Sequence, residues 1–254
     1  MLEIEIIPVL ESNYIYLVHD SVTRKTIVFD PAEAKPVLDC LAKKGWRLSY
    51  IFNTHHHWDH VGGNIELKRK TNCIIYGFDA GRIPGLDIQL VDGQVIPLSG
   101  DHPVKVLHLP GHTAGDLIYF FEKDKIAFVG DVLFAMGCGR LFEGTPSQMH
   151  ASLKRLVHEL PSETKIYSAH EYAESDARFA LTVEAANMNL ENRFRHVVHN
   201  TLDKIPNQPA LLSVELETNP FLRTDSAEIR ESLGMHSSSE EEVFADLRKR
   251  KDDF

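Results

Sequence analysis

A run of four histidines and one aspartate constrains this chain more than any other feature. The stretch NTHHHWDHVGG, residues 53–63, holds them within six consecutive positions. It follows LSYIFNT, a pattern typical of a buried strand. Loops at strand ends display functional side chains on a rigid scaffold. The run therefore predicts a fold that presents a polar loop at the end of a strand.

Short β-rich segments alternate with helical ones over the first two-thirds of the chain. Strands are predicted at residues 25–31, 48–54, 73–79, 104–108, 116–122, 125–129 and 164–170. Helical patterns end at Lys44, where Gly45 supplies a stop signal, and cover residues 65–72. Thr145, Pro146 and Gln148 form a helix-start signature. This order predicts an α/β layer architecture.

After Tyr172 the predicted secondary structure changes from alternating strands and helices to helices. A long segment of helical periodicity, poor in strand signals, runs to the break PNQP at residues 206–209. Near the end, SSSEEEVFADLRKRK predicts a Ser-capped helix. We therefore predict two domains, residues 1–172 and 173–254, with the second one smaller and helical.

Composition and charge exclude several classes of protein. The chain has 254 residues, 43% of them hydrophobic and 25% charged, which is typical of a globular protein with a sizeable core. Its formal net charge of −10 disfavours nucleic-acid binding. No apolar run is long enough to span a membrane. The acidic first residues do not read as a signal peptide, and the three cysteines are too few and too far apart for a disulfide framework. A cytoplasmic location is expected, with a monomer as the default oligomeric state.

The histidine run has the spacing of a metal site. His55 and His57 are two residues apart, so in extended backbone they share a side, whereas His56 points away. Asp59 and His60 follow after a turn and approach from another direction. Four ligands in six residues exceed what one closed tetrahedral zinc site takes from so short a stretch. Two metal ions that share the stretch fit better.

Three further candidate ligands stand at other predicted strand ends. PGHTAGD contains His112, FVGDVLF contains Asp131 and YSAHEY contains His170. Small or turn residues bracket each of them, which suits a side chain displayed at a strand terminus. The alternative is that these are structural or surface histidines. Four separate motifs that together supply five His and two Asp favour a metal site.

These motifs resemble the metallo-β-lactamase superfamily and, within it, the glyoxalase II (hydroxyacylglutathione hydrolase) family. The segments SNYIYLV, GCGRLFEGT, NPFLR and LRKRKDDF extend the resemblance over nearly the whole chain. The resemblance implies an αββα sandwich that holds two divalent metal ions, followed by a smaller all-α domain that helps to bind glutathione. Zinc is the first expectation for the metal, and iron and manganese remain open.

The resemblance also implies which residues act. It assigns His55, His57 and His112 to the first metal. It assigns Asp59, His60 and His170 to the second metal, with Asp131 as the bridge between them. The implied reaction is hydrolysis of S-2-hydroxyacylglutathione thioesters, such as S-D-lactoylglutathione, in methylglyoxal detoxification. A metal-bridging hydroxide, held with Asp59 and Asp131, would attack the thioester carbonyl.

A thioester suits such a site because its leaving thiol, with a pKa of about 8.5, departs readily as a thiolate. No side-chain nucleophile is then needed. Cys138, in MGCGR, is the alternative nucleophile, and a small packed thiol is the favoured interpretation.

Five residues are implied in binding the glutathione moiety, namely Arg140, Phe142, Tyr172, Arg248 and Lys251. Arg140 and Phe142 depart from the Lys and Tyr of the familiar eukaryotic pattern, and Phe142 lacks the hydroxyl that could bind the peptide part of glutathione. The alternative for Arg248 and Lys251 is a solvated helix end that complements the helix dipole. Lys249 and Arg250 are expected to be solvated.

Other functions stay open at this point. The same scaffold could serve a persulfide dioxygenase with a single iron, a lactonase or a β-lactamase. A non-catalytic metal- or glutathione-binding module is the alternative from another class. The filled set of seven ligand positions counts against that module.

Overall fold

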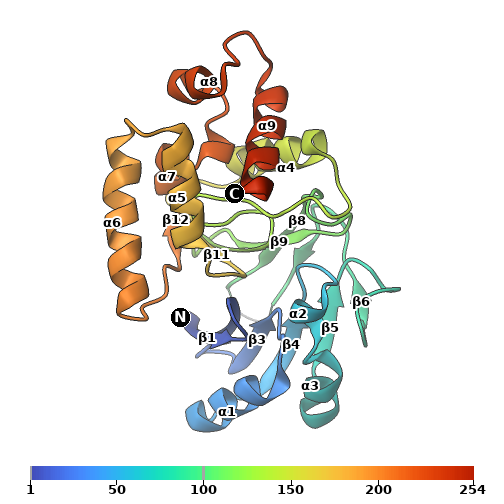
Figure 1. The fold of residues 1–254 in the computed structure, drawn as a ribbon. Helices are drawn as coiled ribbons and strands as arrows, with labels where there is room; N and C mark the ends of the chain where they lie inside the picture. Colours follow the sequence, from blue (N-terminus) through green and yellow to red (C-terminus); the bar gives the residue numbers. More distant parts are fainter. Residues whose placement is uncertain (1, 99–100) are drawn as a thin grey trace. The chain divides into compact units, whose positions relative to one another are not determined.

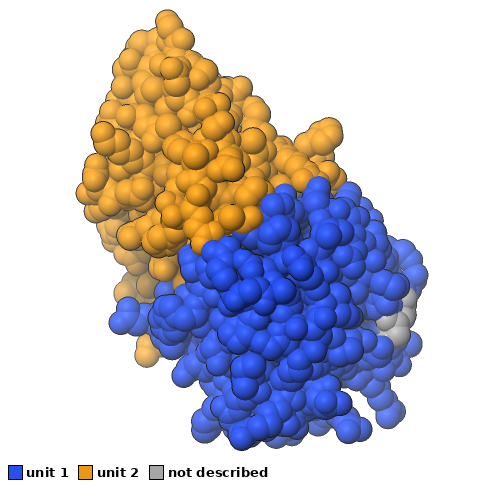
Figure 2. Space-filling model, turned by 90° about the vertical axis from the view of Figure 1, so that its right-hand side faces the viewer, with its two compact units in different colours: residues 1–108, 115–130 blue, residues 109–114, 131–254 orange. Residues whose placement is uncertain are grey.

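The computed structural model describes residues 2–98 and 101–254. The chain forms two compact units, coloured separately in Figure 2. Unit 1 comprises residues 1–108 and 115–130, and unit 2 comprises residues 109–114 and 131–254. The predicted domain boundary after residue 172 lies inside unit 2, so the division into two sequence domains stays a prediction.

The first sheet of unit 1 has the strand order β1-β2-β3-β4-β5-β6 (Figure 1). Its strands are β1 (Leu2–Val9), β2 (Asn13–Asp20), β3 (Lys25–Phe29), β4 (Leu48–Phe52), β5 (Ile74–Gly77) and β6 (Ile88–Gln89). The pairs β1-β2 and β2-β3 are antiparallel, whereas β3, β4, β5 and β6 are parallel. Because parallel neighbours end at the same edge, Asp30 after β3 and Asn53 after β4 start their loops side by side.

The second sheet of unit 1 is an antiparallel meander in the order β10-β9-β8-β7. Its strands are β7 (Val95–Ile96), β8 (Val104–His108), β9 (Leu117–Phe121) and β10 (Ile126–Gly130). Aromatic rings join the two sheets. Phe29 of β3 stacks on Phe128 of β10 with 3.9 Å between ring centroids, and Phe52 of β4 stacks on Tyr119 of β9 at 4.9 Å. The sheets thus form the two central layers of unit 1.

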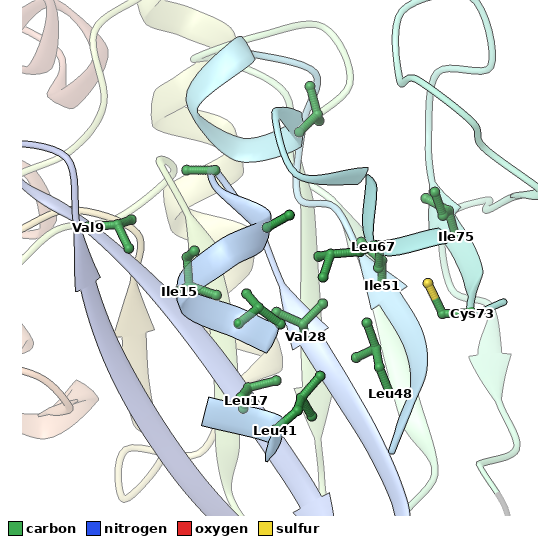
Figure 3. Packing of buried hydrophobic residues seen from close by; sticks show 14 of the residues in the cluster. Val9, Ile15, Leu17, Val28, Leu41, Leu48, Ile51, Leu67, Cys73 and Ile75 are labelled. Atoms are coloured by element: carbon green, nitrogen blue, oxygen red, sulfur yellow. The ribbon is translucent and has the colours of Figure 1, made fainter. Parts of the chain in front are cut away.

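Helices α1 (Ala34–Lys44) and α3 (Asn64–Thr71) cover the other face of the first sheet. Figure 3 shows Leu41 of α1 and Leu67 of α3 among strand residues such as Val28 and Ile51. In β4, Ile51 faces these helices and the next residue, Phe52, faces the second sheet, as the two-residue period of a strand requires. Because strands such as β4 are buried on both faces, their sequences are nearly continuous runs of apolar residues.

Unit 2 is mostly helical. Its elements are α4 (Pro146–Glu159), β11 (Lys165–Ser168), α5 (Ala173–Val183), α6 (Met188–Leu202), β12 (Ala210–Leu211), α7 (Leu212–Thr218), the 3-10 helix η1 (Pro220–Leu222), α8 (Ala227–Leu233) and α9 (Glu240–Asp253). The capping box of Thr145 and Gln148 begins α4, and Ser239 caps α9, so both predicted helix starts are confirmed. Strand β12, which pairs with β11, is the one departure from helix and loop among residues 173–254.

The long helical segment predicted after Tyr172 is broken at residues 184–187. Glu184, buried at that break, accepts hydrogen bonds from Arg223 and Ser226, and these bonds favour a turn there. Alanines on α5 let α6 approach closely, and they form a cluster with Leu190 and Val197. In the part of the chain that the structure describes, no helix has both the length and the apolar character needed to cross a membrane.

Candidate functional site

The histidine-rich stretch leaves β4 and enters the short helix α2 (Trp58–Val61) inside unit 1. His55 and His60 are buried, and their ring centroids lie 4.0 Å apart. His55 Nε2 lies 3.0 Å from His57 Nδ1. His60 Nε2 lies 3.6 Å from Oδ2 of Asp59. Unit 1 thus gathers four of the seven predicted ligands in one small region.

Two residues outside the stretch hold it in place. The buried Asp30, which follows β3, accepts hydrogen bonds from the Thr54 backbone N–H at 2.8 Å and from the Thr54 hydroxyl at 2.7 Å. Its Oδ2 also lies 3.1 Å from Nδ1 of His60. Asn13 Nδ2 donates to Oδ2 of Asp59 at 2.9 Å. A carboxylate behind a ligating imidazole fixes the orientation of the ring, and here it orients the opposite nitrogen, His60 Nε2, for a metal.

Sequence reasoning did not identify Asp30 or Asn13 as part of the site. A signal for Asp30 was present, because the Asp-Pro pair ends the strand that precedes the one leading to the histidines. The parallel pairing of β3 with β4 then brings Asp30 beside Thr54. Asn13 carried no such signal. His56, which the family pattern does not assign, lies with Nε2 3.1 Å from Nη1 of Arg82.

Unit 2 gathers the remaining three predicted ligands from three separate segments. His112 Nε2 and His170 Nε2 each lie 3.4 Å from Oδ2 of Asp131. His112 Nδ1 lies 2.8 Å from the carbonyl oxygen of Arg140. The His170 ring stacks on Tyr172 with 4.9 Å between centroids and an interplanar angle of 4°. Each imidazole of this group is therefore oriented by a neighbour in the same unit.

The donor set of unit 2 fits a divalent metal ion. The Arg140 carbonyl can only accept, so Nδ1 of His112 carries the proton that it donates. In a neutral ring, Nε2 then directs its lone pair toward the carboxylate oxygen of Asp131. Two electron-rich atoms are stable at this separation when a cation binds both of them. Nitrogen and carboxylate ligands of this kind suit zinc, iron and manganese alike.

A cavity of about 420 Å³ lies within unit 2. His112 and Asp131 form part of its wall. The wall also contains every residue predicted to bind the substrate, namely Arg140, Phe142, Tyr172, Arg248 and Lys251. Two of the three predicted ligands of unit 2, His112 and Asp131, therefore share one cavity with the predicted substrate-binding residues.

The basic run near the C-terminus is not simply a solvated helix end. Arg248 is only 4% exposed, and its Nη2 donates to Oδ1 of Asp252 at 2.8 Å. The side chain of Lys251 is 12% exposed. Lys249 and Arg250, by contrast, are exposed, as predicted. Two of the four cations therefore face inward, which is what binding in the cavity requires.

The remaining predicted residues differ in their surroundings. Phe142 is 64% exposed, and its ring meets the His112 ring edge to face at 5.3 Å. Cys138 is buried, and its backbone oxygen accepts a hydrogen bond from Arg248 at 2.8 Å. Burial raises the pKa of the Cys138 thiol to about 11. At neutral pH the thiol is therefore protonated, which argues against a nucleophilic role.

Two family models match the chain. The model described as "Metallo-beta-lactamase superfamily" matches residues 8–170, and "Hydroxyacylglutathione hydrolase C-terminus" matches residues 171–254. The chain is 51% identical to the hydroxyacylglutathione hydrolase of Methylococcus capsulatus, over 100% of this chain and 99% of that protein. It is 46% identical to the hydroxyacylglutathione hydrolase of Maricaulis maris, over 97% of this chain and 96% of that protein.

A solved structure has a similar fold. The crystal structure of TTHA1623 in a di-iron-bound form is 25% identical, has a TM-score of 0.61, and matches 87% of this chain and 100% of that one. The predicted fold class, a metallo-β-lactamase-type α/β sandwich followed by a helical C-terminal domain, is confirmed. This fold and the two groups of His and Asp side chains indicate a divalent metal site. The chain belongs to the hydroxyacylglutathione hydrolase (glyoxalase II) family of the metallo-β-lactamase superfamily.

Proposed function

We propose that this chain hydrolyses S-2-hydroxyacylglutathione thioesters, with S-D-lactoylglutathione as the first substrate to test, and releases a 2-hydroxy acid and glutathione. The observation that carries the proposal is the cavity of unit 2, whose wall combines predicted metal ligands with buried cations. Relatives with the name hydroxyacylglutathione hydrolase align with the chain over nearly their whole length, which supports the same activity. Methylglyoxal detoxification is the corresponding role in the cell.

In this proposal the seven ligands hold two metal ions. Their assignment follows the family pattern, with His55, His57 and His112 at one ion, Asp59, His60 and His170 at the other, and Asp131 at both. When bound, the metal ions would activate water near neutral pH and stabilise negative charge on the carbonyl oxygen of the thioester. Zinc is our first proposal for both positions. The di-iron form of the relative TTHA1623 keeps iron as the main alternative.

The protein's own side chains would bind and orient the substrate. Arg248 and Lys251 supply positive charge for the carboxylates of glutathione, and Arg140 adds an exposed guanidinium at the cavity. Tyr172 offers a hydroxyl, whereas Phe142 offers only an aromatic ring. The leaving thiol, with a pKa of about 8.5, departs as a thiolate, so the proposal requires no general acid from the protein.

We propose that the first predicted domain, residues 1–172, binds the metal ions. The second, residues 173–254, contributes much of the glutathione binding. A cytoplasmic monomer that acts on a small molecule and binds no nucleic acid completes the proposal. The net charge of −10 supports the last point, because it opposes binding to a phosphate backbone.

Metal content and thioesterase activity test the proposal together. The purified protein, loaded with zinc, iron or manganese in turn, is assayed for metal by mass spectrometry and for release of glutathione from S-D-lactoylglutathione. We expect two ions per chain, loss of activity on chelation and recovery on reloading. One tightly held iron with no thioester hydrolysis would instead support the mononuclear oxygenase alternative. Binding of the thioester without cleavage would support the non-catalytic module.

A further inference from the structure

We infer that Asp176 is a built-in counter-ion for Lys251, and that it lowers the affinity of the unit 2 cavity for anionic ligands. The inference rests on the proposed function, because it concerns the cavity in which the carboxylates of glutathione would bind. Asp176 lies in the first turn of α5 and Lys251 in the last turn of α9, and both belong to the cavity wall.

The ammonium group of Lys251 is held on α5 by two adjacent residues. Its Nζ lies 3.1 Å from Oδ1 of Asp176 and donates to the hydroxyl of Ser175 at 3.0 Å. The rings of Phe254 and Phe179 lie 5.1 Å and 5.7 Å from the same nitrogen. These contacts fix the cation at the cavity wall, and they also satisfy part of its hydrogen-bonding capacity before any ligand arrives.

Asp176 is buried against a glycine in the neighbouring loop. It is 4% exposed, and a Cβ atom added to Gly137 would lie 2.1 Å from its Oδ2. Among the described residues, Oδ2 has no hydrogen-bond partner. Solvent therefore screens this carboxylate poorly, and its charge acts strongly on Lys251 and on whatever binds beside it.

The same burial brings the titration of Asp176 close to physiological pH. Burial raises the pKa of Asp176 to about 6, an effect that Lys251 and Arg248 of α9 oppose and Glu215 of α7 reinforces. Cys138, on the loop that carries Gly137, also faces this group, and its own pKa is raised to about 11. Asp176 is thus mostly ionised at pH 7 and mostly neutral at pH 5.

A ligand carboxylate and Asp176 would compete for one ammonium group. Above pH 6 the ionised Asp176 neutralises Lys251 and repels an incoming carboxylate. Below pH 6 Asp176 is protonated and neutral. The positive charge of Lys251 then attracts the ligand carboxylate without competition, so the ligand binds more tightly. Arg248 differs, because the side chain of its partner Asp252 is 43% exposed and solvent screens that charge.

Isothermal titration calorimetry on the metal-loaded protein tests the inference. The probe is S-methylglutathione, whose capped sulfur cannot bind a metal as a thiolate. Its α-carboxyl and α-amino groups, with pKa values of about 3.5 and 8, keep their charge between pH 5 and 7. We expect the Kd of the wild-type protein to rise about fivefold from pH 5 to pH 7, as a nearby negative charge forms. For Asp176→Asn, we expect the Kd at pH 5 and at pH 7 to equal the low Kd that the wild-type protein has at pH 5.

Two further variants, Lys251→Met and Glu191→Gln, separate this effect from a structural one. In Lys251→Met, both the pH effect and the effect of Asp176→Asn should disappear, because Lys251 lowers the pKa of Asp176 and, without it, the buried carboxyl stays neutral between pH 5 and 7. This single variant tests the inference even when Asp176→Asn does not fold. Glu191→Gln, which removes a carboxylate paired with Arg195 on α6, is the matched control and should behave as the wild type.

Each outcome has a distinct meaning. An equal pH dependence in the wild type and in Asp176→Asn would overturn the inference and leave the proposed function intact, since the titration would then belong to other groups. A weaker, rather than tighter, Kd in Asp176→Asn at pH 7 would also overturn it. Failure of the wild-type protein to bind S-methylglutathione at any pH would overturn the inference and the proposed glutathione site together.

Discussion

The two groups of predicted metal ligands are built in opposite ways. In unit 1, His55, His57, Asp59 and His60 come from one six-residue stretch at the end of β4. In unit 2, three ligands come from three distant segments and meet around the carboxylate of Asp131. The first group is specified by local sequence and the second by the fold of unit 2. A dense local motif is therefore visible in the sequence, whereas ligands from distant segments become a group only when their unit folds.

The supports of the two groups differ as well. Asp30 holds the unit 1 stretch through Thr54 and His60, and it reaches them because β3 and β4 are neighbours. In unit 2, the orienting contacts come from residues that also line the unit 2 cavity, namely Arg140 and Tyr172. The unit 1 group therefore has a purely structural support, whereas the residues that support the unit 2 group also have a proposed role in substrate binding.

The largest expected effect is at the centre of the unit 2 group. Asp131→Ala removes the oxygen that lies 3.4 Å from both His112 and His170. We expect kcat/KM for S-D-lactoylglutathione to fall by about three orders of magnitude, because both proposed metal positions use Asp131 as a ligand. Steady-state kinetics together with metal analysis measure the effect. Full metal content with near wild-type turnover would remove Asp131 from the centre of the site.

A smaller effect is expected behind the unit 1 group. Asp30→Asn keeps the shape of the side chain but replaces a carboxylate that accepts from Thr54 and faces His60. Metal affinity, measured by competition with a chelator, should fall by about 10- to 100-fold. The control is Asp39→Asn, which alters an exposed carboxylate paired with Lys35 on α1. Equal metal affinity in both variants would mean that the stretch needs no such support.

The burial of Asp176 predicts a pH-dependent stability in unit 2. The folded-state pKa of about 6 lies above the value of 3.8 for an unperturbed aspartate, so the folded protein binds the proton more tightly. This contribution to stability is present below pH 4 and is lost as pH rises through 6. Its size is about 3 kcal/mol. Relative to Asp176→Asn, the free energy of unfolding of the wild type in urea should therefore fall between pH 4 and 7. A constant difference across that range would contradict the prediction.

A substitution of Phe142 tests the proposed substrate binding beside the unit 2 group. Its exposed ring meets His112, and it occupies a position where the familiar eukaryotic pattern has tyrosine. In Phe142→Tyr, a new hydroxyl can bind the peptide part of glutathione, so KM should fall about threefold with kcat unchanged. An unchanged KM would mean that this position does not contact the glutathione moiety.

The smallest effect is expected at Cys138. Because the buried thiol has a raised pKa and the proposed reaction needs no side-chain nucleophile, Cys138→Ser should keep kcat within about twofold of the wild type. Single-turnover measurements that show no accumulated acyl-enzyme provide the second readout. Loss of turnover with normal metal content would restore Cys138 as a candidate nucleophile.

Residues whose role depends on local sequence could be predicted, whereas those that depend on distant partners could not. Strand ends, helix caps and the dense ligand motif are local patterns, which is why Thr145, Ser239 and the strands before the ligands were predicted correctly. Burial of Arg248 could not be read from a basic run, because it depends on the loop of Cys138. The break at Glu184 likewise depends on Arg223, which is far away in sequence.

The most direct test of the central claim compares two thioesters on the metal-loaded protein. The measurement is kcat/KM for S-D-lactoylglutathione against the D-lactoyl thioester of N-acetylcysteamine, which lacks both carboxylates of glutathione. Two charged contacts of roughly 1.5 kcal/mol each correspond to a preference of about 100-fold for the glutathione thioester, and this is the result we predict. Comparable rates would retain the thioesterase chemistry but exclude glutathione recognition in the cavity of unit 2. Hydrolysis of neither thioester would contradict the account as a whole.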